Sequence, residues 1–167
     1  LHTMYANGRG VEQDFKKSRL FLEKAAQRGD KGGQYTLAIR LDQEGDYEGA
    51  VEWYKKAASD GINRHAQHRL AEIYDHGYLG EQDLKKAMHY YLITAKAGYR
   101  SSAYRVAEIY YSQGKFKMAY IWAGAVMQGE WLSKARNLKE KASFEMEPLE
   151  ALKLEKQVRR YRRLYLN

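Results

Sequence analysis

The sequence predicts an all-α fold: a solenoid of about four short helix-turn-helix repeats followed by C-terminal helices. Its 167 residues include one proline and few of the β-branched residues that favour strands, which indicates helix throughout. Four segments end alike in a glycine, and the spacings of 32, 37 and 31 residues between them each leave room for two helices and two turns. These residues are Gly29, Gly61, Gly98 and Gly129.

A second pattern repeats over a distance of 69 residues. The set Gly8, Glu12, Gln13 and Asp14 recurs as Gly77, Glu81, Gln82 and Asp83. Tyr35, Ala38 and Gly45 recur at the same offset as Tyr104, Ala107 and Gly114. The array therefore alternates a long-turn repeat with a short-turn repeat, as a duplicated pair of repeats would.

Each repeat has the pattern of two helices that pack against each other. The first helix carries apolar residues at helical spacing, as in Tyr35, Leu37, Ala38 and Leu41, and a glycine ends it. The second helix begins at an aspartate that can cap it, at Asp14, Asp46 and Asp83. Small and large residues then alternate, for example Ala57 and Ala95 with Trp53 and Tyr91. Neither helix can bury its apolar stripe alone, so the repeats must stack.

The composition excludes several kinds of site. The chain has no cysteine, which removes disulfides, thiolate metal sites and cysteine nucleophiles. It has no apolar run long enough to span a membrane and no signal-peptide pattern. The chain opens at Leu1 in what reads as the middle of a repeat, so we expect further repeats to precede it.

The repeat residues resemble the Sel-one-like repeat, a relative of the tetratricopeptide repeat. The segments from Met4 to Gly29 and from Leu70 to Gly98 follow its pattern, whereas the second and fourth units look more like plain tetratricopeptide units. The fourth is the weakest, with Ala123 and Val126 where an aromatic residue and an alanine are expected. We therefore divide the chain into a truncated first repeat (1–29), repeats at 30–61, 62–98 and 99–129, and C-terminal capping helices (130–167).

The resemblance implies a right-handed superhelix that acts as a protein-interaction scaffold or adaptor, without shared catalytic residues. It favours a bacterial protein of the periplasm or cell envelope, with the cytoplasm as the alternative. In such superhelices the first helix of each pair lines the concave face. On this chain that position predicts a peptide-binding groove formed by Tyr35, Asp42, Gln43, His68, Glu72, Asp75, His76, Tyr104, Glu108 and Tyr111.

The predicted groove is aromatic and acidic, which suits a peptide with cationic and apolar side chains. The alternative is that these residues form an ordinary solvated face and the packing between repeats. Four histidines, His65, His68, His76 and His89, lie near one another in the sequence, but none has a dedicated metal-ligand spacing. We predict no metal, cofactor or small-molecule substrate. A hydrolase built on His68, Glu72 and His76 is a remote alternative.

The last predicted helix, Leu149 to Leu166, is strongly basic. It begins after Pro148, and its apolar side carries Ala151, Leu154, Val158, Tyr161 and Tyr165. From Ala151 onward there are six cations and one anion, a net charge of +5 out of +8 for the chain. The helix either caps the last repeat or docks on an anionic membrane, an acidic partner or a nucleic acid through Arg159, Arg160, Arg162 and Arg163. Both can hold, because they use different faces. Nucleic acid is least favoured, because no separate nucleic-acid fold is present.

Overall fold

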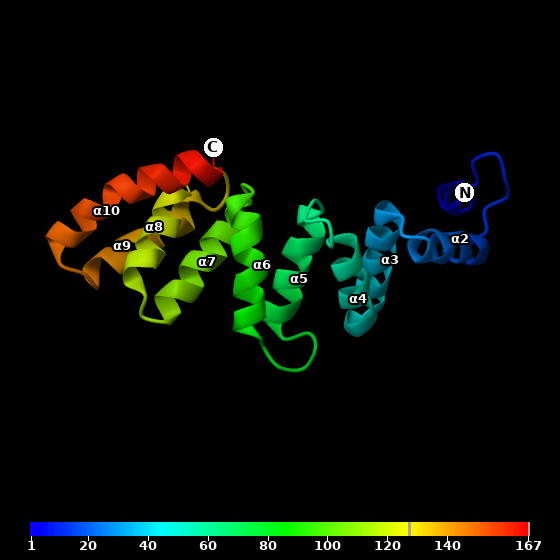
Figure 1. Cartoon of the computed structure of the whole chain (residues 1–167), viewed down its shortest axis with the longest axis horizontal. Coiled ribbons are helices and arrows are strands. Elements are labelled where there is room, and N and C mark those ends of the chain that lie inside the picture. The colour runs from blue at the N-terminus through cyan, green and yellow to red at the C-terminus, as the bar shows by residue number, and fades with distance from the viewer. Residues whose placement is uncertain (127, 167) are drawn as a thin grey trace. The chain divides into compact units, whose positions relative to one another are not determined.

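The computed structural model describes residues 1–126 and 128–166, and all regular structure in these ranges is helical (Figure 1). This confirms the predicted all-α fold, and the helices pack in sequential pairs. The elements are α1 (His2–Asn7), α2 (Phe15–Gln27), α3 (Lys31–Glu44), α4 (Tyr47–Ala57), α5 (Arg64–His76), α6 (Leu84–Lys96), α7 (Arg100–Ser112), α8 (Phe116–Ala125), α9 (Leu132–Phe144), α10 (Pro148–Tyr161) and the π-helical turn η1 (Arg162–Leu166).

The helices form two compact units. The first unit, Leu1–Glu81, contains α1 to α5, and the second, Gln82–Asn167, contains α6 to η1. The predicted third repeat, 62–98, thus contributes α5 to the first unit and α6 to the second. The predicted capping segment contains α9 and α10, which add one more helix pair after the fourth predicted repeat.

Local backbone chemistry explains where the repeat helices begin and end. The side chains of Asp14, Asp46 and Asp83 each accept a hydrogen bond of 2.9 Å from the backbone N–H three residues later, which confirms their predicted capping role. Gly45 ends α3 with φ 83° and Gly77 ends α5 with φ 69°. A side chain would strain this left-handed backbone, so the sequence requires glycine there.

In the first unit, α2, α3 and α4 surround a small apolar core. Leu22, Ala26 and Leu37 are buried in it, and Leu41 and Trp53 pack against it. The first helix, α1, has no buried residue, although the ring of its Tyr5 stacks on Phe21 with centroids 5.5 Å apart. Burial therefore increases from α1 into the following helices.

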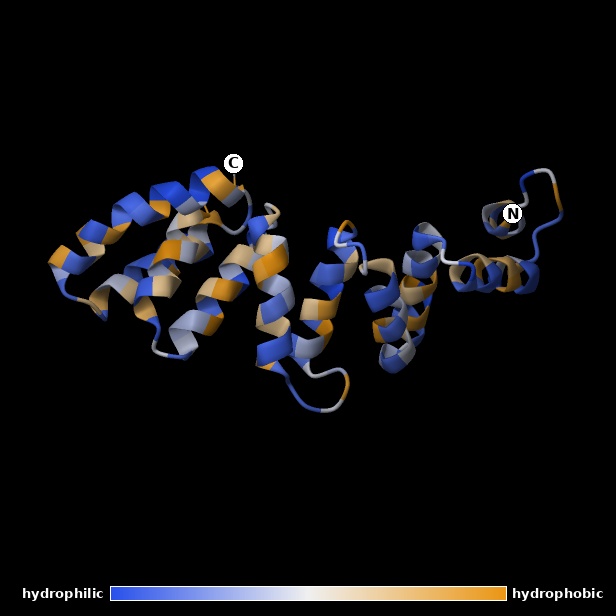
Figure 2. Cartoon of the chain, viewed as in Figure 1, coloured by the Kyte–Doolittle hydropathy of each residue, from blue (hydrophilic) through white to orange (hydrophobic). Residues whose placement is uncertain are grey.

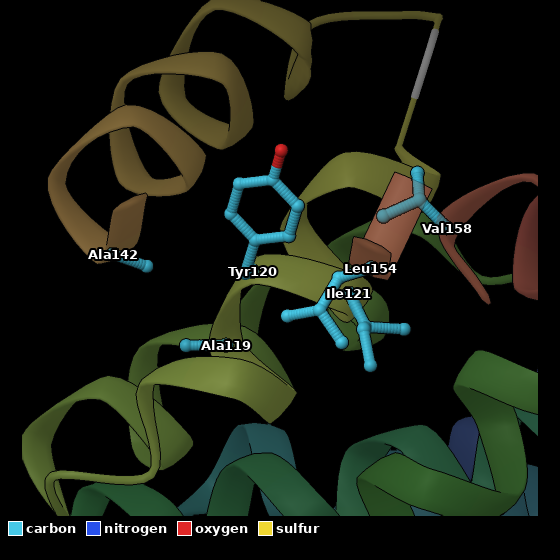
Figure 3. Close-up of a cluster of buried hydrophobic side chains, with 6 residues drawn as sticks. All are labelled: Ala119, Tyr120, Ile121, Ala142, Leu154 and Val158. Atoms are coloured by element: carbon cyan, nitrogen blue, oxygen red, sulfur yellow. The ribbon is translucent and has the colours of Figure 1, made fainter. Parts of the chain in front are cut away.

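In the second unit, α8 is the most buried helix, and α10 lies across it. Leu154 and Val158 of α10 join Tyr120 and Ile121 of α8 in one core cluster (Figure 3). A Cβ atom at Gly124 would lie 2.9 Å from a methyl carbon of Val158, so the absent side chain lets the two helices approach closely. The apolar face predicted for the last helix is thus packed against α8.

The predicted single helix from Leu149 to Leu166 is wrong in its last turn. The α-helix ends at Tyr161 and continues as η1, which returns the chain to α6 and α8. In this wider turn Arg162 donates a 3.0 Å hydrogen bond to the carbonyl oxygen of Gly124. Tyr165 stacks on the buried Trp122, with ring centroids 6.0 Å apart. Where the α-helix α10 gives way to the π-helical turn η1, the chain thus makes new contacts with α8.

Candidate functional site

The residues predicted to line the groove fall into two sets. Tyr35, Asp42, Gln43, His68, Glu72, Asp75 and His76 lie on α3 and α5 of the first unit. Tyr104, Glu108 and Tyr111 lie on α7 of the second unit. The two sets belong to different units, and their role in binding stays a prediction.

In the first unit, Asp42 is the centre of an internal network. The Nε and Nη2 atoms of Arg69 lie 2.6 and 2.8 Å from the two carboxylate oxygens of Asp42, in a bidentate ion pair. The hydroxyl of Tyr54 donates a further hydrogen bond of 2.9 Å to Asp42. Only 9% of the Asp42 side chain is exposed. This carboxylate therefore joins α3, α4 and α5 and has little surface left for a ligand.

The electrostatics of this network favour its charged form. Burial would raise the pKa of the Asp42 carboxyl, but the hydrogen bonds from Arg69 and Tyr54 outweigh it and lower that pKa. The same hydrogen bond to Asp42 raises the pKa of Arg69. Burial, followed by the hydrogen bond to Asp42, raises the pKa of the Tyr54 hydroxyl. The pair is thus ionised and the tyrosine is a neutral donor at physiological pH.

The other polar side chains of α5 are also engaged within the unit. Glu72 lies 3.0 Å from Nη1 of Arg69 and 3.5 Å from Nε2 of His68. Burial lowers the pKa of His68 in spite of the Glu72 charge, so the imidazole is neutral at pH 7. Nδ1 of His76 donates a hydrogen bond of 2.8 Å to the backbone carbonyl oxygen of Glu72, and the ring of His76 stacks on Tyr78.

The remaining residues of the first set differ in exposure. Tyr35 is half-buried, and its ring centroid lies 5.9 Å from that of Tyr54. Gln43 is exposed. Asp75 is only 4% exposed, so it belongs to the packed interior and not to a surface that a ligand could reach. Asp42 and Asp75 thus share a role inside the fold that their sequence pattern alone does not indicate.

The second unit carries an aromatic row on α7. Tyr104, Glu108 and Tyr111 are half-buried, and their spacing of four and three residues puts them on one side of the helix. Tyr104 stacks on Trp131 with ring centroids 5.3 Å apart, and Tyr111 meets Phe116 edge-on at the same distance. We call Tyr104, Tyr111, Phe116 and Trp131 the α7 aromatic row. All four rings keep part of their surface exposed, and Tyr111 also packs against the core cluster of α8 and α10.

Charged groups flank the aromatic row. Burial and a hydrogen bond to Glu108 raise the pKa of the Tyr104 hydroxyl to about 12. Arg105 lies 3.2 Å from the same carboxylate, and Lys134 lies over the Trp131 ring at 4.9 Å from its centroid. Two of the chain's own cations thus lie next to the carboxylate and the ring.

Sequence reasoning missed Arg69, Trp131 and Phe116 as members of these surfaces. Arg69 follows His68 directly, so it falls outside a prediction based on one face of α5. Trp131 reads as part of a C-terminal helical stripe, but it precedes α9 and its ring lies against α7. The available signal was the residue type itself, because tryptophan is rare in sequences but enriched at binding surfaces.

The histidines do not form a metal site in the part of the chain that the structure describes. Within residues 1–126 and 128–166, no group of three or more His, Asp or Glu side chains is arranged to hold a metal ion. His68 and His76 both lie near Glu72, but His76 meets its backbone oxygen and His68 its carboxylate. No described helix is long and apolar enough to cross a membrane.

The four arginines predicted for anionic docking divide into two kinds. Arg159, Arg160 and Arg163 are exposed and, with Lys156 and Gln157, line a shallow hollow of about 610 Å³ on the outer side of α10 and η1. Arg162 is half-buried and turned toward α8, where it donates to the Gly124 carbonyl oxygen. Three of the four thus remain available to an external anion.

Comparison with known sequences matches this chain to a protein family. The Sel1 repeat matches residues 3–30, 34–62 and 64–99, which is more than half of the chain. A sel1-like repeat-containing protein of Acanthamoeba polyphaga mimivirus is 29% identical over 113 residues, covering 68% of this chain and 20% of the viral protein. Chitin synthase regulator SKT5 of Saccharomyces cerevisiae is 32% identical over 115 residues, covering 62% of this chain and 16% of the yeast protein.

Solved structures agree with this assignment at the level of the fold. A protective antigen of uropathogenic Escherichia coli with an SLR fold has a TM-score of 0.72 and 22% identity, covering 99% of this chain and 37% of that one. A Sel1 repeat protein from Oxalobacter formigenes has a TM-score of 0.58 and 23% identity, covering 96% and 70%. The chain spans a fifth or less of the length of the two curated relatives. It belongs to the Sel1 repeat family.

Proposed function

We propose that the chain is a non-enzymatic adaptor that binds a segment of another protein on the α7 aromatic row. Sel1 repeat proteins are typically protein-interaction modules. The yeast relative is named as a regulator of chitin synthase, another protein, which fits the same class of function. The observation that carries the proposal is the set of four half-buried rings around α7.

Half-buried tyrosine and tryptophan rings are well suited to binding a partner. Tyrosine and tryptophan offer large contact areas and lose little side-chain entropy on binding, and they are enriched among residues that dominate binding energy. The rings of the row are already held by contacts with one another, so a partner would not have to order them. This surface is therefore pre-organised for an apolar segment.

The neighbouring charges indicate the chemistry of the segment. Glu108 is only partly exposed and is paired with Arg105 across a single helical turn, a contact of small net energy. A lysine or arginine of the partner can replace Arg105 at that carboxylate, or replace Lys134 over the ring of Trp131. In the first unit, by contrast, Arg69 holds Asp42 in a buried pair. We therefore propose an apolar segment with a cationic side chain, bound mainly by the second unit.

The experiment is capture of proteins from the source lysate by the wild-type chain and by a Tyr104→Ala/Tyr111→Ala variant. Direct binding of the captured protein is then measured with each. We expect the variant to bind at least about 30-fold more weakly, because loss of an aromatic anchor costs about 2 kcal/mol or more. Tyr104→Phe/Tyr111→Phe keeps the rings and should retain most of the affinity.

A matched control removes two exposed aromatic rings elsewhere. Phe15 and Phe144 are both largely exposed and lie outside the row, so Phe15→Ala/Phe144→Ala should bind as the wild type does. Helical content and thermal unfolding are measured for every variant. Equal binding by the folded Tyr104→Ala/Tyr111→Ala variant and the wild type would refute the proposal.

A further inference from the structure

The outer side of α10 and η1 combines cations with exposed leucines. Lys153, Lys156, Arg159, Arg160 and Arg163 are exposed there. Leu149, Leu152 and Leu164 are 63%, 69% and 52% exposed. The helical positions of Leu149 and Leu152 are opposite those of Leu154 and Val158, which pack on α8. We call this set of eight residues the basic face. Figure 2 shows that most of the ribbon of α10 and η1 is hydrophilic, with apolar positions near the two ends of this segment.

The acidic side chains near this helix are used elsewhere. Glu155, the one anion after Ala151, accepts hydrogen bonds of 2.5 Å from Lys139 and 2.6 Å from Tyr120. Glu150 forms a 2.5 Å ion pair with Lys117 of α8. No ion pair joins any of the five cations of the basic face to another described residue, although the charge of Arg159 helps to lower the pKa of Glu155. This part of the fold therefore leaves most of their positive charge uncompensated.

The basic face is held rigidly. Leu154 and Val158 are buried against α8, the contact of Gly124 with Val158 fixes the distance between the helices, and Arg162 ties η1 to α8. The helix therefore does not need the cations for its own packing. The face is fixed with its cations and leucines toward solvent, so its composition reflects something other than the stability of the unit.

We propose that the basic face docks on the surface of an anionic lipid bilayer. The cations would lie at the level of the lipid phosphates, and the leucines would enter the boundary between headgroups and acyl chains. This mixture favours a membrane over a nucleic acid, because exposed leucines gain nothing at a phosphate backbone and the face offers no aromatic ring for base stacking. The proposal is independent of the α7 aromatic row, so an adaptor would also be held at a membrane.

The experiment measures binding of the whole chain to lipid vesicles by flotation. Vesicles of phosphatidylcholine alone are compared with vesicles of three parts phosphatidylcholine to one part phosphatidylserine. We expect binding to the anionic vesicles, weakened by added salt because the attraction between exposed charges is screened. Binding to the neutral vesicles should be far weaker.

Two variants test the cations and the leucines separately. Each cation near an anionic surface contributes about fivefold to the partition coefficient, so Arg159→Gln/Arg160→Gln/Arg163→Gln should reduce it roughly 100-fold. Leu149→Ser/Leu152→Ser should reduce it roughly tenfold through the lost apolar contact. A control with the same change in charge, Lys16→Gln/Lys85→Gln/Lys96→Gln, alters exposed lysines on α2 and α6 and should keep most of the binding.

Several results would overturn the proposal. One is an absence of binding to anionic vesicles at low salt. A second is an equal loss in the lysine control, which would indicate attraction by net charge alone. A third is binding that the leucine variant leaves unchanged while an oligonucleotide competes fully with the vesicles, which would assign the face to nucleic acid. None of these measurements involves the protein partner of the α7 aromatic row, so they leave the proposed adaptor function to its own test.

Discussion

The helices α1 and α8 show what neighbours do to a repeat helix. In the first unit, α1 contacts α2 and has no buried residue. In the second, α8 contacts α7, α9 and α10, and the seven residues from Ala119 to Ala125 are all buried. Both helices are short, so length does not explain the difference. A helix of this fold owes its burial to the elements stacked on it and not to its own sequence pattern alone.

The strongest test of this comparison removes the helix that covers α8. A chain that ends at Glu147 lacks α10 and η1, and with them Leu154 and Val158, each of which contributes about 1.5–3 kcal/mol by burial. We expect the second unit to lose its cooperative unfolding while the first unit stays protected. Hydrogen exchange resolved along the chain measures both.

The matched control deletes residues 1–13, which contain α1. Because α1 buries no residue, this deletion should change the protection of α3 to α5 little. Retained protection of α8 in the chain that ends at Glu147 would show that α10 is dispensable for the unit. Because the second unit is expected to unfold, this truncation cannot separate the role of the α7 aromatic row from that of the basic face. Point substitutions can separate them.

A second prediction concerns the Asp42–Arg69 pair of the first unit. Arg69→Met would leave the mostly buried Asp42 carboxylate without its cation and should cost about 1.5–3 kcal/mol in the free energy of unfolding. Arg19→Met removes an arginine that pairs with exposed Glu23 and Glu44 and should cost less than about 1 kcal/mol. Urea unfolding measures both. Equal costs would mean that Asp42 is not part of the packed interior.

A third prediction concerns the close approach of α8 and α10. Gly124→Ala adds a methyl group where Val158 already lies and should destabilise the second unit by about 1–3 kcal/mol. Adding Val158→Ala should restore part of this loss, because it removes the opposing methyl groups. Gly32→Ala, where the nearest atom is 3.5 Å away, is the control and should be neutral or slightly stabilising in urea unfolding.

The smallest expected effect is a dependence on pH. The folded-state pKa of Asp42 lies below its ordinary value of 3.8, so the folded chain binds this proton less readily than the unfolded chain. The contribution of Asp42 to stability is therefore complete above that value and is lost as the pH falls through it toward the folded pKa. Urea midpoints between neutral pH and about pH 3 should show a steeper decline for the wild type than for Asp42→Asn.

The sequence predicted the fold more fully than the surfaces. Glycine spacing and aspartate caps depend on local backbone chemistry, so they could be read directly, as at Asp46 and Gly77. The departure from the repeat pattern at Ala123 has a physical reason, because α8 is covered by α10 and needs small residues for close packing. Asp42 could not be assigned from its helix position, since its partners Tyr54 and Arg69 come from other helices.

We propose that the α7 aromatic row, and not the basic face, binds the protein partner. The most direct measurement compares the affinity of a captured partner for three folded chains: wild type, Tyr104→Ala/Tyr111→Ala, and Arg159→Gln/Arg160→Gln/Arg163→Gln. We predict that the tyrosine variant loses at least about 30-fold and that the arginine variant binds as the wild type does. A loss confined to the arginine variant would contradict the account and assign partner binding to α10.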